Sequence, residues 1–268
     1  MRLIKFTRKM SDGSKAKDVL LINWQCHNHL TGSGQKTDIS GDWTSMCTKE
    51  IEKQKDCYAA YYQGCAGNYN ETDKYFQDNN RTTNYEEFGK FLAEYAIKAY
   101  DKLDSYKTGE VKAETKEFTY SANHKYDNLQ NAARQVQELF KRLQSHDAII
   151  PLCKEVGVHG YFHANAIINH AKEGANYTIP LSVASIGDIA ITFAPAELFG
   201  EAGVDIRSRS PYKFTFTNCY SDEHHGYIPI SKYYEFTCYE EYMSPYAQGA
   251  SEKIVDQYID MLNEIKGN

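Results

Sequence analysis

The sequence has no apolar run near the roughly 20 residues that a membrane-spanning helix needs, so it predicts no transmembrane segment. It does not open with a basic stretch followed by an apolar one, so no signal peptide is predicted, which favours a cytoplasmic location. Basic residues are not in excess: 30 Lys and Arg face 36 Asp and Glu, for a net charge of -6. This balance argues against nucleic acid as a partner.

The cysteines lack the C-x-x-C spacing of a metal site, and their number, seven, is odd. We therefore expect buried thiols rather than a disulfide framework. Internal repeats and low-complexity linkers are also missing. Hydrophobic residues make up 41% of the chain and charged residues 25%, which are ordinary values for a globular protein. At 268 residues the chain is at the upper end of one domain, and nothing in it indicates an oligomeric state.

Hydrophobic periodicity predicts an α/β fold with a mixed central sheet flanked by helices, in a single domain. Strands are expected at residues 2–6, 18–24, 57–63, 112–121, 177–186, 189–193 and 212–218. Helices are expected at residues 42–54, 83–103, 128–143 and 251–265, in pieces over 147–173, and from Pro195 onward. The pieces over 147–173 should break near Gly157 and Gly160.

Two segments that follow predicted strands carry candidate chemistry. The run NWQCHNH at 23–29 places His27 and His29 on one side of an extended chain, where they are metal-ligand candidates or ordinary surface or core histidines. The run QGCAGNYN at 63–70 is rich in small residues. Its glycines allow backbone N–H groups to approach a substrate oxygen, although an ordinary tight turn gives the same pattern.

Two later segments add carboxylate, imidazole and phenol groups. Glu197 follows the buried-type strand 189–193 and is expected at a helix start, either as a hard metal ligand or as a charge that complements the helix dipole. The loop SDEHHGYIP at 221–229 holds His224, His225 and Tyr227, and is a ligand-dense site or a solvated turn.

In this order the motifs resemble the catalytic domain of the neutral/alkaline (non-lysosomal) ceramidase family. No single motif is specific, but eight stand in the family's order over residues 18–265. They are Asn23-Trp24 with His27, SGD at 40–42, QGCAGN at 63–68, IGDIAI at 186–191, PAE at 195–197, RSPY at 209–212, GYIP at 226–229 and GASE at 249–252.

The resemblance implies a Zn²⁺ site of two His, one Glu and one Tyr. His27 takes the second-His position, Glu197 the Glu position and Tyr227 the Tyr position. The family's first His lies upstream of the hairpin that opens this chain, so residues 1–268 are expected to form a ceramidase-like hydrolase domain that lacks its N-terminal segment. Such a ligand set with an open position suits a catalytic zinc that activates water and polarises a carbonyl.

The resemblance also implies a zinc-dependent hydrolase of an amide-type bond in a small-molecule or lipid-like substrate. Tyr227 would be a ligand or oxyanion stabiliser, and the backbone around Gly67 and Asn68 a substrate cradle. Asn70 stands where ceramidases carry a nucleophilic Ser, and a carboxamide cannot replace it, so a metal-activated water would attack. His29 is expected to line the cleft, and His224 and His225 are candidate substrate contacts.

The sequence leaves two alternatives open. In the first, the chain is a non-catalytic relative that binds a ligand or a partner protein, which the missing first His and the missing Ser favour. In the second, it is an inactive truncated fragment, because losing an upstream segment exposes the surface that the segment covered.

Overall fold

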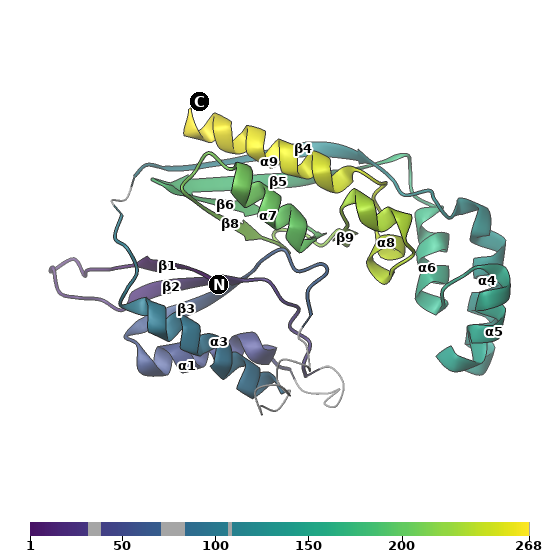
Figure 1. The fold of residues 1–268 in the computed structure, drawn as a ribbon, viewed down its shortest axis with the longest axis horizontal. Coiled ribbons are helices and arrows are strands. Elements are labelled where there is room, and N and C mark those ends of the chain that lie inside the picture. The colour runs from purple at the N-terminus through teal and green to yellow at the C-terminus, as the bar shows by residue number, and fades with distance from the viewer. Residues whose placement is uncertain (32–38, 71–83, 107–108, 268) are drawn as a thin grey trace.

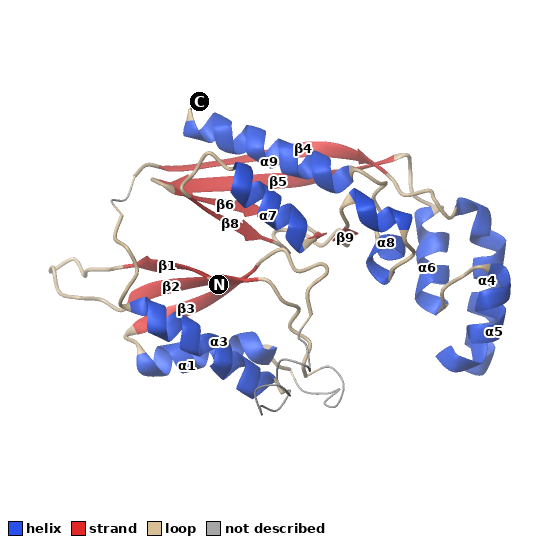
Figure 2. Ribbon diagram, in the orientation of Figure 1, coloured by secondary structure: helices blue, strands red, loops and turns tan. Residues whose placement is uncertain are grey.

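A computed structural model describes residues 1–31, 39–70, 84–106 and 109–267. It has the mixed α/β composition that the sequence predicts (Figure 2). The strands are β1 (Arg2–Phe6), β2 (Asp18–Trp24), β3 (Cys57–Gln63), β4 (Val111–Ser121), β5 (Asn176–Ile186), β6 (Ile189–Phe193), β7 (Glu197–Leu198), β8 (Phe214–Asn218) and β9 (Tyr227–Ile228). They are divided between a three-stranded sheet, a four-stranded sheet and the short β7–β9 pair.

The helices are α1 (Asp42–Gln54), α3 (Tyr85–Tyr100), α4 (Gln130–Leu143), α5 (His146–Val156), α6 (Tyr161–His170), α7 (Gly200–Arg209), α8 (Tyr239–Met243) and α9 (Ala250–Lys266), with 3-10 turns η1 (Asp127–Leu129) and η2 (Ser231–Glu235). In Figure 1, α1 and α3 cover the outer face of the first sheet, and α7 and α9 cover the second. None of the helices that the structure describes combines the length and apolar character that a membrane crossing requires.

The first sheet has the order β1-β2-β3, with β1 antiparallel and β3 parallel to β2. Its core forms because the apolar stripes of α1 and α3 face the same sheet. The fully buried Trp43 packs edge-to-face against Tyr61, with ring centroids 5.1 Å apart, and against Phe88 at 5.2 Å. Gly89 allows this close packing, because a Cβ there would lie 2.5 Å from the Trp43 carbonyl oxygen.

The second sheet has the order β4-β5-β6-β8, with β6 and β8 parallel and the other pairs antiparallel. The predicted stripe of α9, which includes Ile254, Tyr258 and Leu262, is buried against this sheet. The Tyr258 hydroxyl donates to the Phe193 carbonyl at 2.6 Å. The Asn23 side chain on β2 donates to the Thr217 carbonyl on β8 at 3.0 Å, which ties the two sheets together.

Helices α4, α5 and α6 form a separate hydrophobic cluster at one end of the molecule (Figure 1). The predicted breaks are confirmed: Gly157 ends α5 in the left-handed region, with φ of 71°, and α6 follows Gly160, with φ of 123°. None of the seven cysteines, all of which lie among the described residues, forms a disulfide, and six of them are buried, as predicted.

One element prediction near the candidate site is wrong. The segment from Pro195 does not begin a helix, because the Glu197 N–H donates to the Gly226 carbonyl at 2.9 Å and holds the chain extended as β7. The helix begins only at Gly200. Thr83, the predicted start of the 83–103 helix, lies outside the described residues; the described helix is capped by the Asn84 side chain, which accepts from the Glu87 N–H at 2.8 Å.

Candidate functional site

The candidate residues gather where parallel strands end. His27 follows β2, the 64–70 loop follows β3, Glu197 follows β6, and Tyr220 follows β8. Because β2 is parallel to β3, His27 and the 64–70 loop leave the first sheet in the same direction. Because β6 is parallel to β8, the segments with Glu197 and Tyr220 leave the second sheet in the same direction. Carboxyl ends of parallel strands are where α/β proteins place their sites, since the strands hold the following loops rigidly.

His27 is fixed through its backbone. Its N–H donates to the Tyr69 carbonyl at 3.0 Å, and its carbonyl accepts from the Trp43 indole N–H at 3.0 Å. The imidazole Nε2 lies 3.6 Å from Glu197 Oε2, and the two side chains are only 18% and 8% exposed. His29 lies beside it, with ring centroids 5.8 Å apart.

Glu197 is the centre of the cluster. The carboxylate is buried, and its Oε1 is 2.9 Å from His224 Nε2, whereas its Oε2 is buried without a hydrogen-bond partner among the described residues. A buried carboxylate oxygen that lacks a partner is costly, so it marks a position where a ligand would be stabilising.

Tyr227 comes to this carboxylate through strand pairing. β7 and β9 are parallel, and Glu197 pairs directly with Tyr227. The Tyr227 ring lies 6.4 Å from the His27 ring in an edge-on arrangement. Burial is the main cause, and the charge of Glu197 the second, of a raised pKa of Tyr227. The phenol is therefore neutral at physiological pH and can donate a hydrogen bond. The structure thus brings the three predicted ligands His27, Glu197 and Tyr227 together.

Tyr220 is a member of this cluster that the sequence reasoning missed. It has a left-handed backbone with φ of 59°, which is uncommon for a non-glycine residue. Its ring stacks on His224 at 5.6 Å, and burial together with Glu197 raises the pKa of its hydroxyl. The only sequence signal was its place directly after a strand. His225 instead pairs with Glu223, at 2.5 Å.

The segment with Gly67 and Asn68 lies next to the cluster. Its hydrogen bonds differ from the prediction, in which its backbone N–H groups are available to a substrate. The Gly67 N–H donates to the Leu198 carbonyl at 3.0 Å, so it is not the donor that the prediction requires. A Cβ at Gly67 would lie 2.6 Å from the Glu197 carbonyl oxygen, so the glycine is needed for close approach.

Asn68 bridges the loop to the start of α7. Its Nδ2 donates to Glu201 at 2.8 Å, and its Oδ1 accepts from the Gly200 N–H at 2.9 Å. No acceptor among the described residues takes its backbone N–H. Asn70 is exposed at the end of this described segment.

Some of the residues present have the spacing that the zinc implied by the resemblance requires. Two ligands at about 2.0–2.2 Å from one tetrahedral zinc lie about 3.4 Å apart. The 3.6 Å between His27 and Glu197, and the partnerless Oε2, fit this requirement. Across the described ranges, however, no three His, Cys, Asp or Glu side chains form a metal-binding group. Any complete site therefore needs a further donor, and Tyr227 is the nearest candidate among the predicted ligands.

The fold is similar to that of two solved ceramidases. A ceramidase complexed with C2 matches with a TM-score of 0.63 and 14% identity, over 98% of this chain and 48% of that chain. The neutral ceramidase from Pseudomonas aeruginosa matches with a TM-score of 0.61 and 15% identity, over 98% and 47%. The chain thus spans about half the length of these proteins, and the likeness shows a shared fold. No family model and no curated protein matches the sequence.

Proposed function

We propose that this chain is an amide hydrolase related to the ceramidases, with its reaction centre at Glu197, His27 and Tyr227. One observation carries the proposal: the buried, partnerless Oε2 of Glu197 faces His27 Nε2 at 3.6 Å. This pair lies where four strand ends converge, in a fold similar to two solved ceramidases. The substrate class that fits is a small-molecule or lipid-like amide.

The donor set suits zinc. His27, Glu197 and Tyr227 would hold the ion as an N/O ligand set, which is typical of catalytic zinc with an open position. When bound there, zinc supplies Lewis-acid polarisation of the scissile carbonyl and makes a water molecule more acidic.

The surrounding residues have separate roles in this proposal. His224 holds Oε1 of Glu197 at 2.9 Å, which orients the carboxylate so that Oε2 points toward His27. The Asn68 N–H, which no described backbone carbonyl accepts, would donate to the oxygen that gains charge during attack. Because Asn70 cannot act as a nucleophile, water would supply the oxygen: a C–O bond forms, the C–N bond breaks, and the amine leaves with a proton.

The test is hydrolysis of a panel of N-acyl amides of increasing chain length by the wild type and by Glu197→Gln. The variant keeps the shape of the side chain but removes the charge, so we expect at least a roughly 100-fold loss of rate. The matched control is Glu223→Gln, which removes an exposed carboxylate from the same loop region and should leave the rate unchanged. Equal rates for wild type and Glu197→Gln would refute the proposed centre.

A non-catalytic binding protein is the second candidate, favoured by the exposed Asn70 at the position where the resemblance places a nucleophile. In that case the panel amides bind, but no member is hydrolysed faster by the wild type than by Glu197→Gln. Measuring binding and hydrolysis on the same panel separates the two functions.

A further inference from the structure

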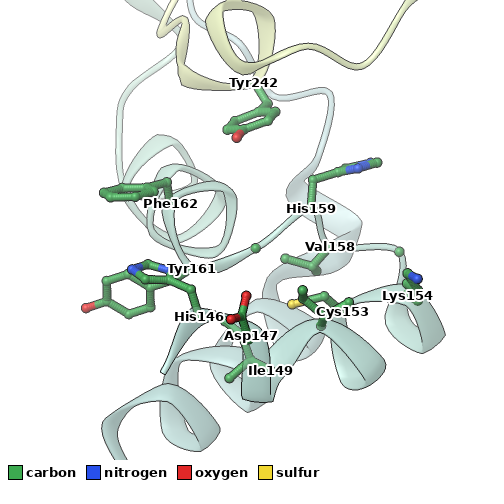
Figure 3. A pocket seen from close by; sticks show the side chains of 13 residues that line it. His146, Asp147, Ile149, Cys153, Lys154, Val158, His159, Tyr161, Phe162 and Tyr242 are labelled. Carbon is green, nitrogen blue, oxygen red and sulfur yellow. The ribbon is translucent and has the colours of Figure 1, made fainter. Parts of the chain in front are cut away.

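The helical end of the molecule contains a pocket of about 580 Å³, which lies outside the cluster around Glu197. It opens between α5, the turn before α6, the start of α6, and α8. Aliphatic and aromatic side chains dominate its lining, among them Ile149, Cys153, Val158, Tyr161, Phe162 and Tyr242. Figure 3 shows Tyr242 on one side of the cavity, with Val158 and Cys153 opposite and Phe162 at the flank. Its volume is within the roughly 300–1,000 Å³ of small-molecule sites.

The backbone of the turn keeps the pocket open. Gly157 and Gly160 both line it and both have positive φ, and a Cβ at either position would meet no atom within 4 Å. Any other residue would be strained at these angles and would fill part of the space. At these two positions the turn therefore contributes backbone alone, whereas Val158 and His159 between them contribute side chains.

The rim of the pocket exposes large apolar groups. Ile150 is 44% exposed and Phe162 is 52% exposed, and both belong to the lining. Exposed apolar side chains that border an apolar cavity gain burial when a ligand enters. The lining also includes Asp147 and Lys154, whose opposite charges cancel, and the imidazoles of His146 and His159. The pocket therefore favours hydrocarbon over a head group of particular charge.

A row of rings connects this pocket to the candidate site. The Tyr242 ring meets Tyr239 at 5.6 Å, and Tyr239 meets Tyr227 at 5.8 Å, both in edge-to-face geometry. Tyr242 thus lies in the pocket wall and is only two ring contacts from a proposed zinc ligand. Helix α8 therefore borders both, since Tyr242 lines the pocket and Tyr239 contacts Tyr227.

We infer that this pocket binds the hydrocarbon chain of a lipid-like molecule. The binding itself follows from the lining, the open turn and the exposed rim, and does not depend on hydrolysis. That the bound chain belongs to the substrate amide rests on the proposed function and on the row of tyrosines.

The probe is dansylamino-undecanoic acid, whose fluorescence rises when it enters an apolar environment. We expect saturable binding at one site, with displacement by dodecanoic acid and by dodecanol alike, because the charges of the lining cancel. Ile150→Asp should weaken binding about 10-fold or more, because it places a charge at an apolar rim. Leu143→Asp is the matched control: Leu143 is 43% exposed on the neighbouring helix and is not part of the lining, so affinity should not change.

Glu197→Gln separates the two proposals, because it should bind the probe like the wild type even where it hydrolyses nothing. Absence of saturable binding, or equal affinities for Ile150→Asp and Leu143→Asp, would overturn the inference. So would loss of probe binding in Glu197→Gln with retention in Ile150→Asp, since the chain would then bind at the Glu197 cluster instead.

Discussion

His163 should make the stability of the helical end depend on pH in a way that can be calculated. The side chain is fully buried on α6, with its ring 4.6 Å from Tyr126 and 4.5 Å from Tyr242. Its Nδ1 accepts the His159 N–H at 3.0 Å, and its Nε2 has no partner among the described residues. Burial, together with the positive charge of neighbouring His159, His170 and Lys125, lowers the pKa of His163 from 6.5 to about 4.

The sign of the effect follows from proton binding. In the unfolded chain His163 titrates near 6.5, so below that pH the unfolded state binds more protons than the folded state. The stability associated with the neutral ring is complete above pH 6.5 and is lost as the pH falls toward about 4. By about pH 5, the two pKa values correspond to a loss of about 2 kcal/mol in the free energy of unfolding.

The assay is urea unfolding of the wild type and His163→Asn at pH 7.5 and pH 5, since Asn keeps an acceptor for the His159 N–H. The difference in unfolding free energy, wild type minus variant, should fall by about 2 kcal/mol between the two pH values. His146→Asn, which replaces an exposed histidine on the same helical unit, is the matched control. A difference that stays constant within about 0.5 kcal/mol would refute the burial argument.

Gly89→Ala should lower the free energy of unfolding in urea by about 2 kcal/mol, because the new Cβ would press on the Trp43 carbonyl. Gly174→Ala is the control: a Cβ there meets no atom within 4 Å, so its free energy of unfolding should stay within about 0.5 kcal/mol of the wild type. Asn68→Asp should lower the melting temperature, because it replaces the donor to Glu201 with a second carboxylate, at a cost of about 2 kcal/mol. An unchanged melting temperature would contradict the role of Asn68 in joining the loop to α7. Arg209→Ala should cost less than about 1 kcal/mol in the same assay, because its ion pairs with Asp205 and Asp256 are exposed.

The sequence pattern predicts a helix or a break correctly where contacts between neighbouring residues determine the structure. The stripe of α9 is helical and buried as expected, and the breaks at Gly157 and Gly160 occur where left-handed backbone is required. Glu197 was misassigned because its extended backbone depends on Gly226, some 30 residues away, whereas a Pro-Ala-Glu run alone favours a helix start. Sequence periodicity carries no information about such a contact.

The same distinction applies to the candidate site. His27, Glu197 and Tyr227 could be named because each follows or lies in a recognisable motif, and the fold brings them together. The pairing of His224 with Glu197, the place of Tyr220 beside that carboxylate, and the hydrogen bond from the Gly67 N–H to the Leu198 carbonyl all join segments that are far apart in the sequence. The aromatic pocket likewise combines residues from three helices, so no single segment of sequence reveals it.

The central claim is that the Glu197 cluster is a zinc-dependent reaction centre, and the most direct test is the zinc content of the purified protein after equilibration with zinc and removal of the excess. We expect about one equivalent in the wild type, in His29→Ala and in the distant control His146→Ala. His27→Ala and Glu197→Gln should lose it while remaining folded by circular dichroism. No zinc in the wild type, or equal zinc in all five proteins, would contradict the account.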